Sequence, residues 1–157
     1  MRSTRPQMFM DIAHVVSKRS TCMRLNVGAV VVSKRSIISI GYNGAPAGAP
    51  HCAGNDCPGR VRCFEAIHAE DNAMRHLPAH VTANSKANLD LYVTHSPCAG
   101  CCEVIASYPV SRVFFGTPYR ITDHLDDDDQ WPFEVYRVTP AGYVSSWPSQ
   151  ELVNVET

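Results

Sequence analysis

The sequence predicts an α/β domain in which helices are layered against a mixed sheet of about five strands. Segments whose apolar residues repeat at helical spacing alternate with short β-branched runs along most of the chain. The chain has 157 residues, which is enough for one domain with a single core. No internal repeat or linker divides it, so residues 1–157 are expected to form one domain with its core at about 7–138.

The first half of the chain predicts a helix and a hairpin. The helix is expected over about residues 7–18, where apolar side chains recur at Met8, Ile12, Val15 and Val16. The β-branched runs at 27–33 and 36–41 are joined by the polar pair 34–35, so they are expected to pair as a hairpin. The stretch at 44–63 is rich in glycine, proline and cysteine, and is interpreted as an insert without regular structure.

The second half predicts helices that alternate with strands. Helices are expected over 66–77 and 98–108, and strands over 89–95, 111–116 and 133–138. Pro78 is expected to end the first of these helices, and Pro97 stands where the second begins. The tail at 140–157 matches no element.

Composition narrows the class of protein. The net charge is −1 and 18% of the residues are charged, so nothing favours a nucleic-acid partner. The acidic run at 126–129 is expected to be a solvated loop or helix end. The N-terminal stretch MRSTRPQMFMDIAHVV is too polar for a signal peptide or a membrane span, so a cytoplasmic protein with no membrane partner is expected. In that compartment seven cysteines, an odd number, indicate thiols or metal ligands rather than disulfides.

Three candidate metal ligands stand at the starts of two predicted helices. Cys98 and Cys101 are three residues apart, so both can reach one ion, and a helix N-terminus favours their thiolate forms. His68 begins the other helix and offers an imidazole. Two thiolates and one imidazole leave a tetrahedral zinc with one open position, which is typical of a catalytic zinc.

Glu70 supplies the group that such a zinc needs for catalysis. A zinc ion lowers the pKa of water bound at the open position to near neutrality. Glu70, two residues after His68, is the expected carrier of the proton that this water releases. H-x-E followed by P-C-x-x-C is the signature of zinc-dependent nucleobase deaminases, and it is complete here in HAE (68–70) and PCAGC (97–101). Cys102 points elsewhere on its helix and is interpreted as a buried, inert thiol.

Four longer stretches resemble the deoxycytidylate (dCMP) deaminase family of bacteria and phages. They are STCMRLNVGAVVV, SIGYNGAPAGAPHC, CFEAIHAEDNA and LYVTHSPCAGCCEVI, and the resemblance covers roughly residues 7–120. It implies a three-layer α/β/α sandwich and the hydrolysis of dCMP to dUMP and ammonia, which feeds thymidylate synthesis. It also implies a cytoplasmic enzyme, in the host cytoplasm if the chain is of phage origin.

The resemblance assigns roles to further residues. Asn43 would hydrogen-bond the deoxyribose, although Asn-Gly is also a favoured turn dipeptide. Val27 would form an apolar wall against the base or else belong to the strand core, and the Ala69 backbone would contact the exocyclic edge. Substrate contacts are further expected from Asn26, Ser96 and Tyr119. The donors for the substrate phosphate are not identified, and the candidates are Arg24, Asn26 and Arg120.

The resemblance also implies a second metal and possible regulation. A structural zinc would bind Cys22, Cys52, Cys57 and Cys63, with His51 able to replace one cysteine. Many members of the family are homohexamers activated by dCTP and inhibited by dTTP with Mg²⁺, partly through the loop at Gly41, Tyr42 and Gly44, whereas others lack this control.

Two alternatives stay open on the sequence alone. One is a deaminase of the same fold that acts on another substrate, such as 5-substituted dCMP, a free nucleoside or base, or tRNA. The other is a zinc-stabilised binding module without catalysis, which would have no need of Glu70.

Overall fold

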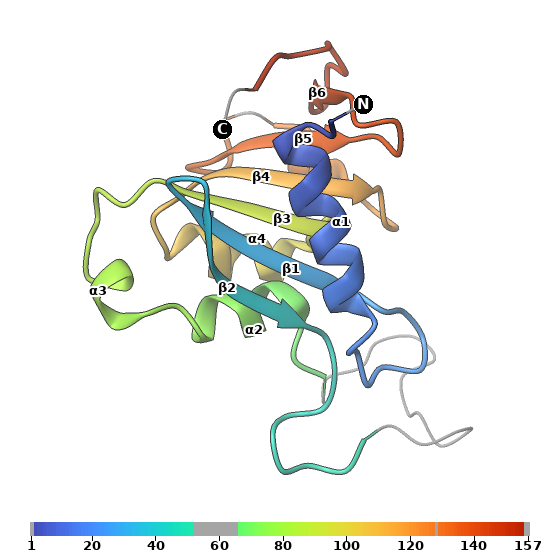
Figure 1. The fold of residues 1–157 in the computed structure, drawn as a ribbon, viewed down its shortest axis with the longest axis vertical. Helices are drawn as coiled ribbons and strands as arrows, with labels where there is room; N and C mark the ends of the chain where they lie inside the picture. The colour runs from blue at the N-terminus through green and yellow to red at the C-terminus, as the bar shows by residue number, and fades with distance from the viewer. Residues whose placement is uncertain (1, 52–65, 128, 156–157) are drawn as a thin grey trace.

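The computed structural model describes residues 2–51, 66–127 and 129–155, and it confirms the α/β class. Its strands are β1 (Gly28–Ser33), β2 (Ser36–Tyr42), β3 (Leu89–His95), β4 (Val110–Thr117), β5 (Glu134–Val138) and β6 (Val144–Ser146). Its helices are α1 (Arg5–Ser17), α2 (Ala69–Arg75), α3 (Ala79–Thr82) and α4 (Ala99–Ala106), with a 3-10 helix η2 (Asp123–Leu125). The strands form one sheet in the order β2-β1-β3-β4-β5-β6 (Figure 1).

The sheet is mixed, and its strand directions bring the functional loops to one end. β1 pairs antiparallel with both β2 and β3, whereas β3, β4 and β5 run parallel and β6 returns antiparallel. The ends of β2, β3 and β4 therefore lie beside the start of β1, since Gly28 pairs with Tyr42, Ala29 with Val93, and His95 with Thr117. We call this edge the His95 end of the sheet.

Two hydrophobic cores lie on opposite faces of the sheet, because successive side chains of a strand point to opposite faces. Leu91, Val93 and Phe115 point toward α2 and α4. Tyr92 and Phe114 point toward α1, and their rings stack with centroids 4.5 Å apart. The result is the expected three-layer sandwich, with α1 on one face and α2 and α4 on the other (Figure 1).

Two glycines let the helices approach the sheet closely at the His95 end. A Cβ on Gly28 would collide with the Ala13 carbonyl oxygen of α1, and a Cβ on Gly41 with the Ala69 carbonyl oxygen of α2. Both glycines are therefore required by packing, and they fix α1 and α2 against neighbouring strands.

The structure shifts some predicted bounds. The helix expected over 66–77 is the shorter α2, because Ile67 forms a backbone bridge with Gly44 and His68 adopts an extended conformation as N-cap. The chain also resumes a helical turn as α3 immediately after Pro78, which is its N-cap. The helix expected over 98–108 is shortened to α4, and the tail adds β6, the sixth strand.

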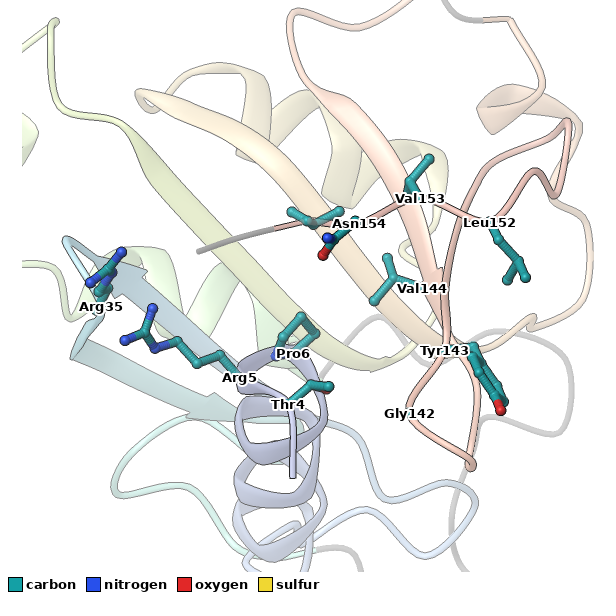
Figure 2. A pocket seen from close by; sticks show the side chains of 11 residues that line it. Thr4, Arg5, Pro6, Arg35, Gly142, Tyr143, Val144, Leu152, Val153 and Asn154 are labelled. Atoms are coloured by element: carbon teal, nitrogen blue, oxygen red, sulfur yellow. The ribbon is translucent and has the colours of Figure 1, made fainter. Parts of the chain in front are cut away.

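A cavity of about 480 Å³ lies beside the first residues of α1 and includes none of the three predicted metal ligands in its lining. Its lining includes Arg35, in the turn between β1 and β2, together with Arg5 and the tail residue Val153 (Figure 2). It is therefore separate from the loops that carry the sequence motifs. In the described part of the chain, no helix has the length and apolar character needed to span a membrane.

Candidate metal and active site

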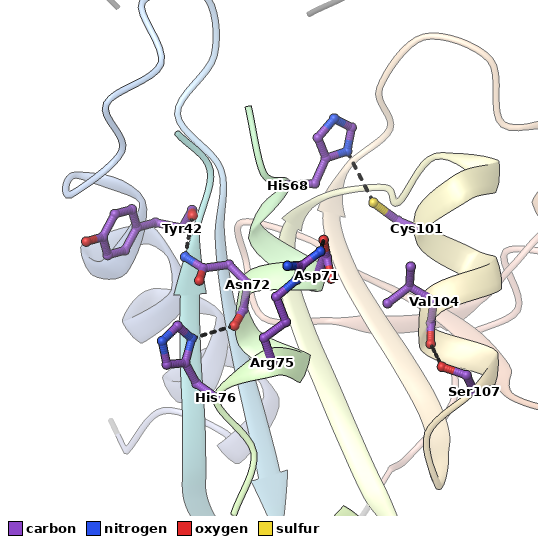
Figure 3. A network of polar contacts seen from close by, with 9 residues as sticks. All are labelled: Tyr42, His68, Asp71, Asn72, Arg75, His76, Cys101, Val104 and Ser107. Carbon is purple, nitrogen blue, oxygen red and sulfur yellow. Dashed lines mark hydrogen bonds and ion pairs between the residues drawn. The ribbon is translucent and has the colours of Figure 1, made fainter. Parts of the chain in front are cut away.

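The three predicted ligands meet between the first residues of two helices. His68 is the N-cap of α2 and Cys98 is the N-cap of α4, and neither side chain caps its own helix. Both side chains are therefore free to turn toward each other, and Cys101 follows one turn along α4. The His68 Nδ1 atom lies 3.2 Å from the Cys101 Sγ atom (Figure 3). It lies 3.6 Å from the Cys98 Sγ atom.

This donor set fits a zinc ion. The three donor atoms all lie within 4.8 Å of one another, and among the described residues the group has these three members. Two sulfurs and an imidazole nitrogen are ligands that zinc prefers. His68 and Cys98 are exposed whereas Cys101 is buried, so the group faces solvent on one side.

Hydrogen bonds among the three ligands shift their pKa values when no metal is bound. Hydrogen bonds from Cys101 and His68 lower the pKa of the Cys98 thiol to about 3. The same contact with Cys98, together with burial, raises the pKa of Cys101, and the hydrogen bond with Cys98 raises the pKa of His68. The cluster thus holds one thiolate that accepts hydrogen bonds from two neighbours. A cation bound here would take the place of those shared protons.

Glu70 lies beside the ligands on the first turn of α2. Its side chain is only 4% exposed, and burial raises the pKa of its carboxyl group. The neighbouring Asp71 faces outward and pairs with Arg75 at 2.8 Å, so the two acidic residues of this turn have opposite surroundings (Figure 3). Cys102 is fully buried, as predicted, and burial raises the pKa of its thiol to about 12.

Ser96 and Tyr119 lie together at the His95 end. The Ser96 hydroxyl oxygen accepts a hydrogen bond from the Tyr119 backbone N–H at 2.8 Å, and the Tyr119 ring meets the His95 ring edge-on at 6.0 Å. Burial, and to a smaller extent His14, lower the pKa of His95. Ser96 thus holds the loop that carries Tyr119.

Asn43 joins the loop before β1 to the end of β2. Its Oδ1 atom accepts hydrogen bonds from the Val27 backbone N–H at 2.8 Å and the Ser20 hydroxyl at 2.7 Å. Its Nδ2 atom donates to the Leu25 carbonyl oxygen at 2.7 Å. These bonds give Asn43 a structural role in addition to any contact with a ligand, and within residues 2–51, 66–127 and 129–155 one N–H of its amide has no hydrogen-bond partner.

The residues expected to contact an allosteric nucleotide have packing roles in this chain. Gly41 lies against α2, and the Tyr42 carbonyl oxygen accepts a hydrogen bond from the Asn72 side chain at 2.8 Å (Figure 3). Gly44 exchanges two backbone hydrogen bonds with Ile67, just before His68. The loop is therefore connected directly to the start of α2.

The other residues predicted to bind substrate or a second metal have varied surroundings. Val27 is half-buried and packs against the core beneath α2 and α4, whereas Asn26 is exposed. Ala69 is fully buried at the start of α2. Arg24 and Arg120 are exposed, and the Arg120 guanidinium lies over the Tyr119 ring at 4.9 Å.

The structure describes only part of the predicted second metal site. Cys22 is half-buried with a free thiol, and His51 is exposed. Cys52, Cys57 and Cys63 lie outside the described residues.

The structure adds two residues that the sequence did not indicate. The His124 Nε2–H donates to the Pro97 carbonyl oxygen at 2.9 Å, directly before Cys98. The Trp131 indole N–H donates to the His124 carbonyl oxygen at 2.7 Å. Neither belongs to a motif, and the partner atom in each case is a backbone carbonyl distant in sequence, so no local pattern could have identified them.

Comparison with known proteins agrees with this geometry. Residues 3–117 match the family described as the cytidine and deoxycytidylate deaminase zinc-binding region. The deoxycytidylate deaminase of Mycobacterium phage D29 is 37% identical over 124 residues, which cover 69% of this chain and 91% of that protein. ComE operon protein 2 of Bacillus subtilis is 38% identical over 115 residues, which cover 73% of this chain and 60% of that protein.

A solved structure gives the same result. The dCMP deaminase of cyanophage S-TIM5, in complex with dCMP and dUMP, has a TM-score of 0.72 and 33% identity, and the match covers 87% of this chain and 98% of that chain. The aligned fold, the family match and the gathered donors lead to one conclusion: the chain belongs to the cytidine and deoxycytidylate deaminase family.

Proposed function

We propose that the protein hydrolyses dCMP to dUMP and ammonia. The observation that carries the proposal is the cluster of His68, Cys98 and Cys101, with donor atoms within 4.8 Å and the buried Glu70 beside it. The names of the two phage relatives support dCMP as the substrate, because the match with this chain covers most of the length of each relative. A purely structural metal site would have no use for a buried carboxyl group at this position.

His68, Cys98 and Cys101 would hold the zinc ion. When bound, zinc supplies a nucleophile by lowering the pKa of a water molecule. The chain's own contribution is to orient the two thiols and the imidazole from two helix starts, and to leave one side of the group open for the substrate.

Glu70 would carry the protons. Its carboxylate accepts a proton from the attacking water and delivers it to N3 of the cytosine as the C4–O bond forms. It then takes the second proton from the new C4 hydroxyl and passes it to the amino group, so the C4–N bond breaks as the C4=O bond forms, and ammonia leaves. Water and dCMP are thereby converted to dUMP and ammonia with no other reactant.

The loops at the His95 end would hold the nucleotide. Val27 offers an apolar surface to the base, the Ala69 backbone meets its polar edge, and the free amide N–H of Asn43 reaches the deoxyribose. Tyr119 and Arg120 stand on the loop that Ser96 holds, so Arg120 is the phosphate ligand that we favour over Arg24 and Asn26.

Substrate discrimination tests the proposal. A site built for a phosphate leaves its donors unpaired when the phosphate is missing, and such a loss can reduce kcat/KM by about 10⁴-fold. We expect deoxycytidine and cytidine to be much poorer substrates than dCMP, and a small substituent on cytosine C5 to be tolerated better. Equal kcat/KM values for deoxycytidine and dCMP would assign the chain to the nucleoside deaminases.

Regulation and assembly belong to the same proposal. We infer a homo-oligomer, with a hexamer favoured, and a loop at Gly41, Tyr42 and Gly44 that responds to dCTP and dTTP with Mg²⁺. That loop is bonded to the start of α2 through Asn72 and Ile67, so a ligand there has a direct path to His68. Rates of dCMP deamination with and without each nucleotide, combined with sedimentation, test both parts.

A further inference from the structure

Cys98 brings its sulfur into the ligand group from the N-cap position of α4. Its backbone there is extended (φ −77°, ψ 165°), and its side chain makes no capping hydrogen bond. An N-cap serine or aspartate would be fixed by such a bond to the first turn. The sulfur is in contact with His68 and Cys101, and the direction from which it approaches them depends on the peptide that precedes Cys98.

His124 holds that peptide. Its Nε2 atom lies 2.9 Å from the Pro97 carbonyl oxygen, and because a carbonyl can only accept, Nε2 must carry the hydrogen. Pro97 is buried, and the Pro97–Cys98 peptide group is planar, so fixing its oxygen also fixes the orientation of the Cys98 backbone nitrogen. The hydrogen bond thus limits rotation of the peptide that aims the Cys98 side chain.

His124 is itself held from two sides. The next residue, Leu125, is only 1% exposed and lies in the core beneath α2 and α4. The Trp131 indole N–H donates to the His124 carbonyl oxygen at 2.7 Å, and the Trp131 ring stacks on Phe133 with centroids 6.0 Å apart. A chain of contacts therefore runs from the start of β5 through Trp131 and His124 to Pro97.

These residues lie outside the family region. The family match ends at residue 117, whereas His124 and Trp131 belong to the connection between β4 and β5. We propose that His124 is a positioning residue that holds Cys98 in place for the zinc ion. The inference rests on the proposed zinc site, and it assigns to the connection between β4 and β5 a role in keeping the metal bound.

A pair of variants separates the hydrogen bond from the bulk of the ring. His124→Phe keeps a ring but loses the donor, whereas His124→Gln places an amide N–H near the position of Nε2. The exposed His80 on α3 gives a matched control, His80→Phe. The measurement is the rate at which the zinc-loaded protein releases zinc to an excess of chelator, with melting temperatures and the visible spectrum of the cobalt-substituted protein recorded for each variant.

Loss of a residue that orients a metal ligand weakens metal binding by about 10- to 100-fold. We expect His124→Phe to release zinc about 10-fold faster or more, with an altered cobalt spectrum, while His124→Gln and His80→Phe stay near wild type. Equal release from His124→Phe and wild type would overturn the inference, and so would equally fast release from the Phe and Gln variants.

Trp131→Phe tests the same contact chain if His124→Phe does not fold. It removes the indole N–H but keeps a ring on Phe133, and we expect it to release zinc faster than wild type does. Unchanged release in Trp131→Phe would count against the contact chain. Wild-type protein that binds no zinc would refute the proposed function together with this inference, whereas tightly bound zinc with unchanged release in the variants would refute this inference alone.

Discussion

Glu70 and Asp71 are adjacent acidic residues on α2 with opposite surroundings, and they give a matched pair of variants. Glu70→Gln keeps the shape of the buried side chain but cannot transfer protons, so we expect kcat for dCMP to fall by about 10²-fold or more with zinc content unchanged. Asp71→Asn removes only a surface ion pair and should keep near-normal kcat. A Glu70→Gln enzyme that retains a substantial part of the wild-type rate would exclude Glu70 as the proton carrier.

Asn43 and Asn26 are both candidate substrate ligands, but in the part of the chain that the structure describes only Asn43 has internal hydrogen-bond partners. Asn43→Ala leaves the Val27 N–H and the Leu25 carbonyl without their partner, so we expect the free energy of unfolding to fall by about 1–3 kcal/mol. The exposed Asn26→Ala should leave it unchanged. Denaturant unfolding of both variants measures the difference, and equal stabilities would show that the Asn43 bonds contribute little.

The candidate metal ligands and the neighbouring Glu70 could be found in the sequence because their spacing is local. His68 and Glu70 are separated by one residue and Cys98 and Cys101 by two, and each pair stands at a helix start. His124 could not be predicted, because its partner is a backbone carbonyl 27 positions away. Sequence reasoning also assigned Ser96 to the substrate without detecting its hydrogen bond to the Tyr119 backbone.

The contact between β2 and α2 depends on a glycine that has no side chain to keep them apart. Gly41→Ala would place a Cβ against backbone atoms of Ala69 and Ala73, which cannot move aside as a side chain can. We expect a loss of about 1–3 kcal/mol in the free energy of unfolding and weaker zinc binding, because α2 carries His68. Gly100→Ala on α4 meets nothing within 4 Å and should be neutral or slightly stabilising. If both variants unfold at the same denaturant concentration, the close packing is not needed.

The bounds of helices and strands were predicted correctly where the pattern of apolar residues alone determines them. The strand expected over 89–95 has those bounds in β3, because both of its faces are buried and no tertiary contact competes. β6 was missed because it has three residues and is defined by its pairing with β5. The first residues of the helix expected over 66–77 were wrong because a backbone bridge from Ile67 to Gly44 holds them extended.

Zinc content tests the molecule as a whole. We expect about two zinc ions per chain if the cysteines at 22, 52, 57 and 63 form a closed site. Cys98→Ala should remove one ion and abolish deamination, whereas Cys22→Ala should remove the other and mainly lower the melting temperature. Metal analysis by mass spectrometry on each purified variant measures this, and a value near one for wild type would exclude the second site.

The cavity in Figure 2 shows where the ends of the described chain lie. Thr4 and Arg5 line it with Val155 and with Arg35, whose turn is at the opposite end of the sheet from His95. The helix α1 then crosses the sheet, and its last residue, Ser17, reaches Gly28 at the His95 end. The two ends of the described chain therefore lie together at this cavity, and none of the three metal ligands lines it. A resin or electrode attached through either of these segments would be joined away from the metal ligands, so the protein should tolerate immobilisation there with its substrate entrance uncovered.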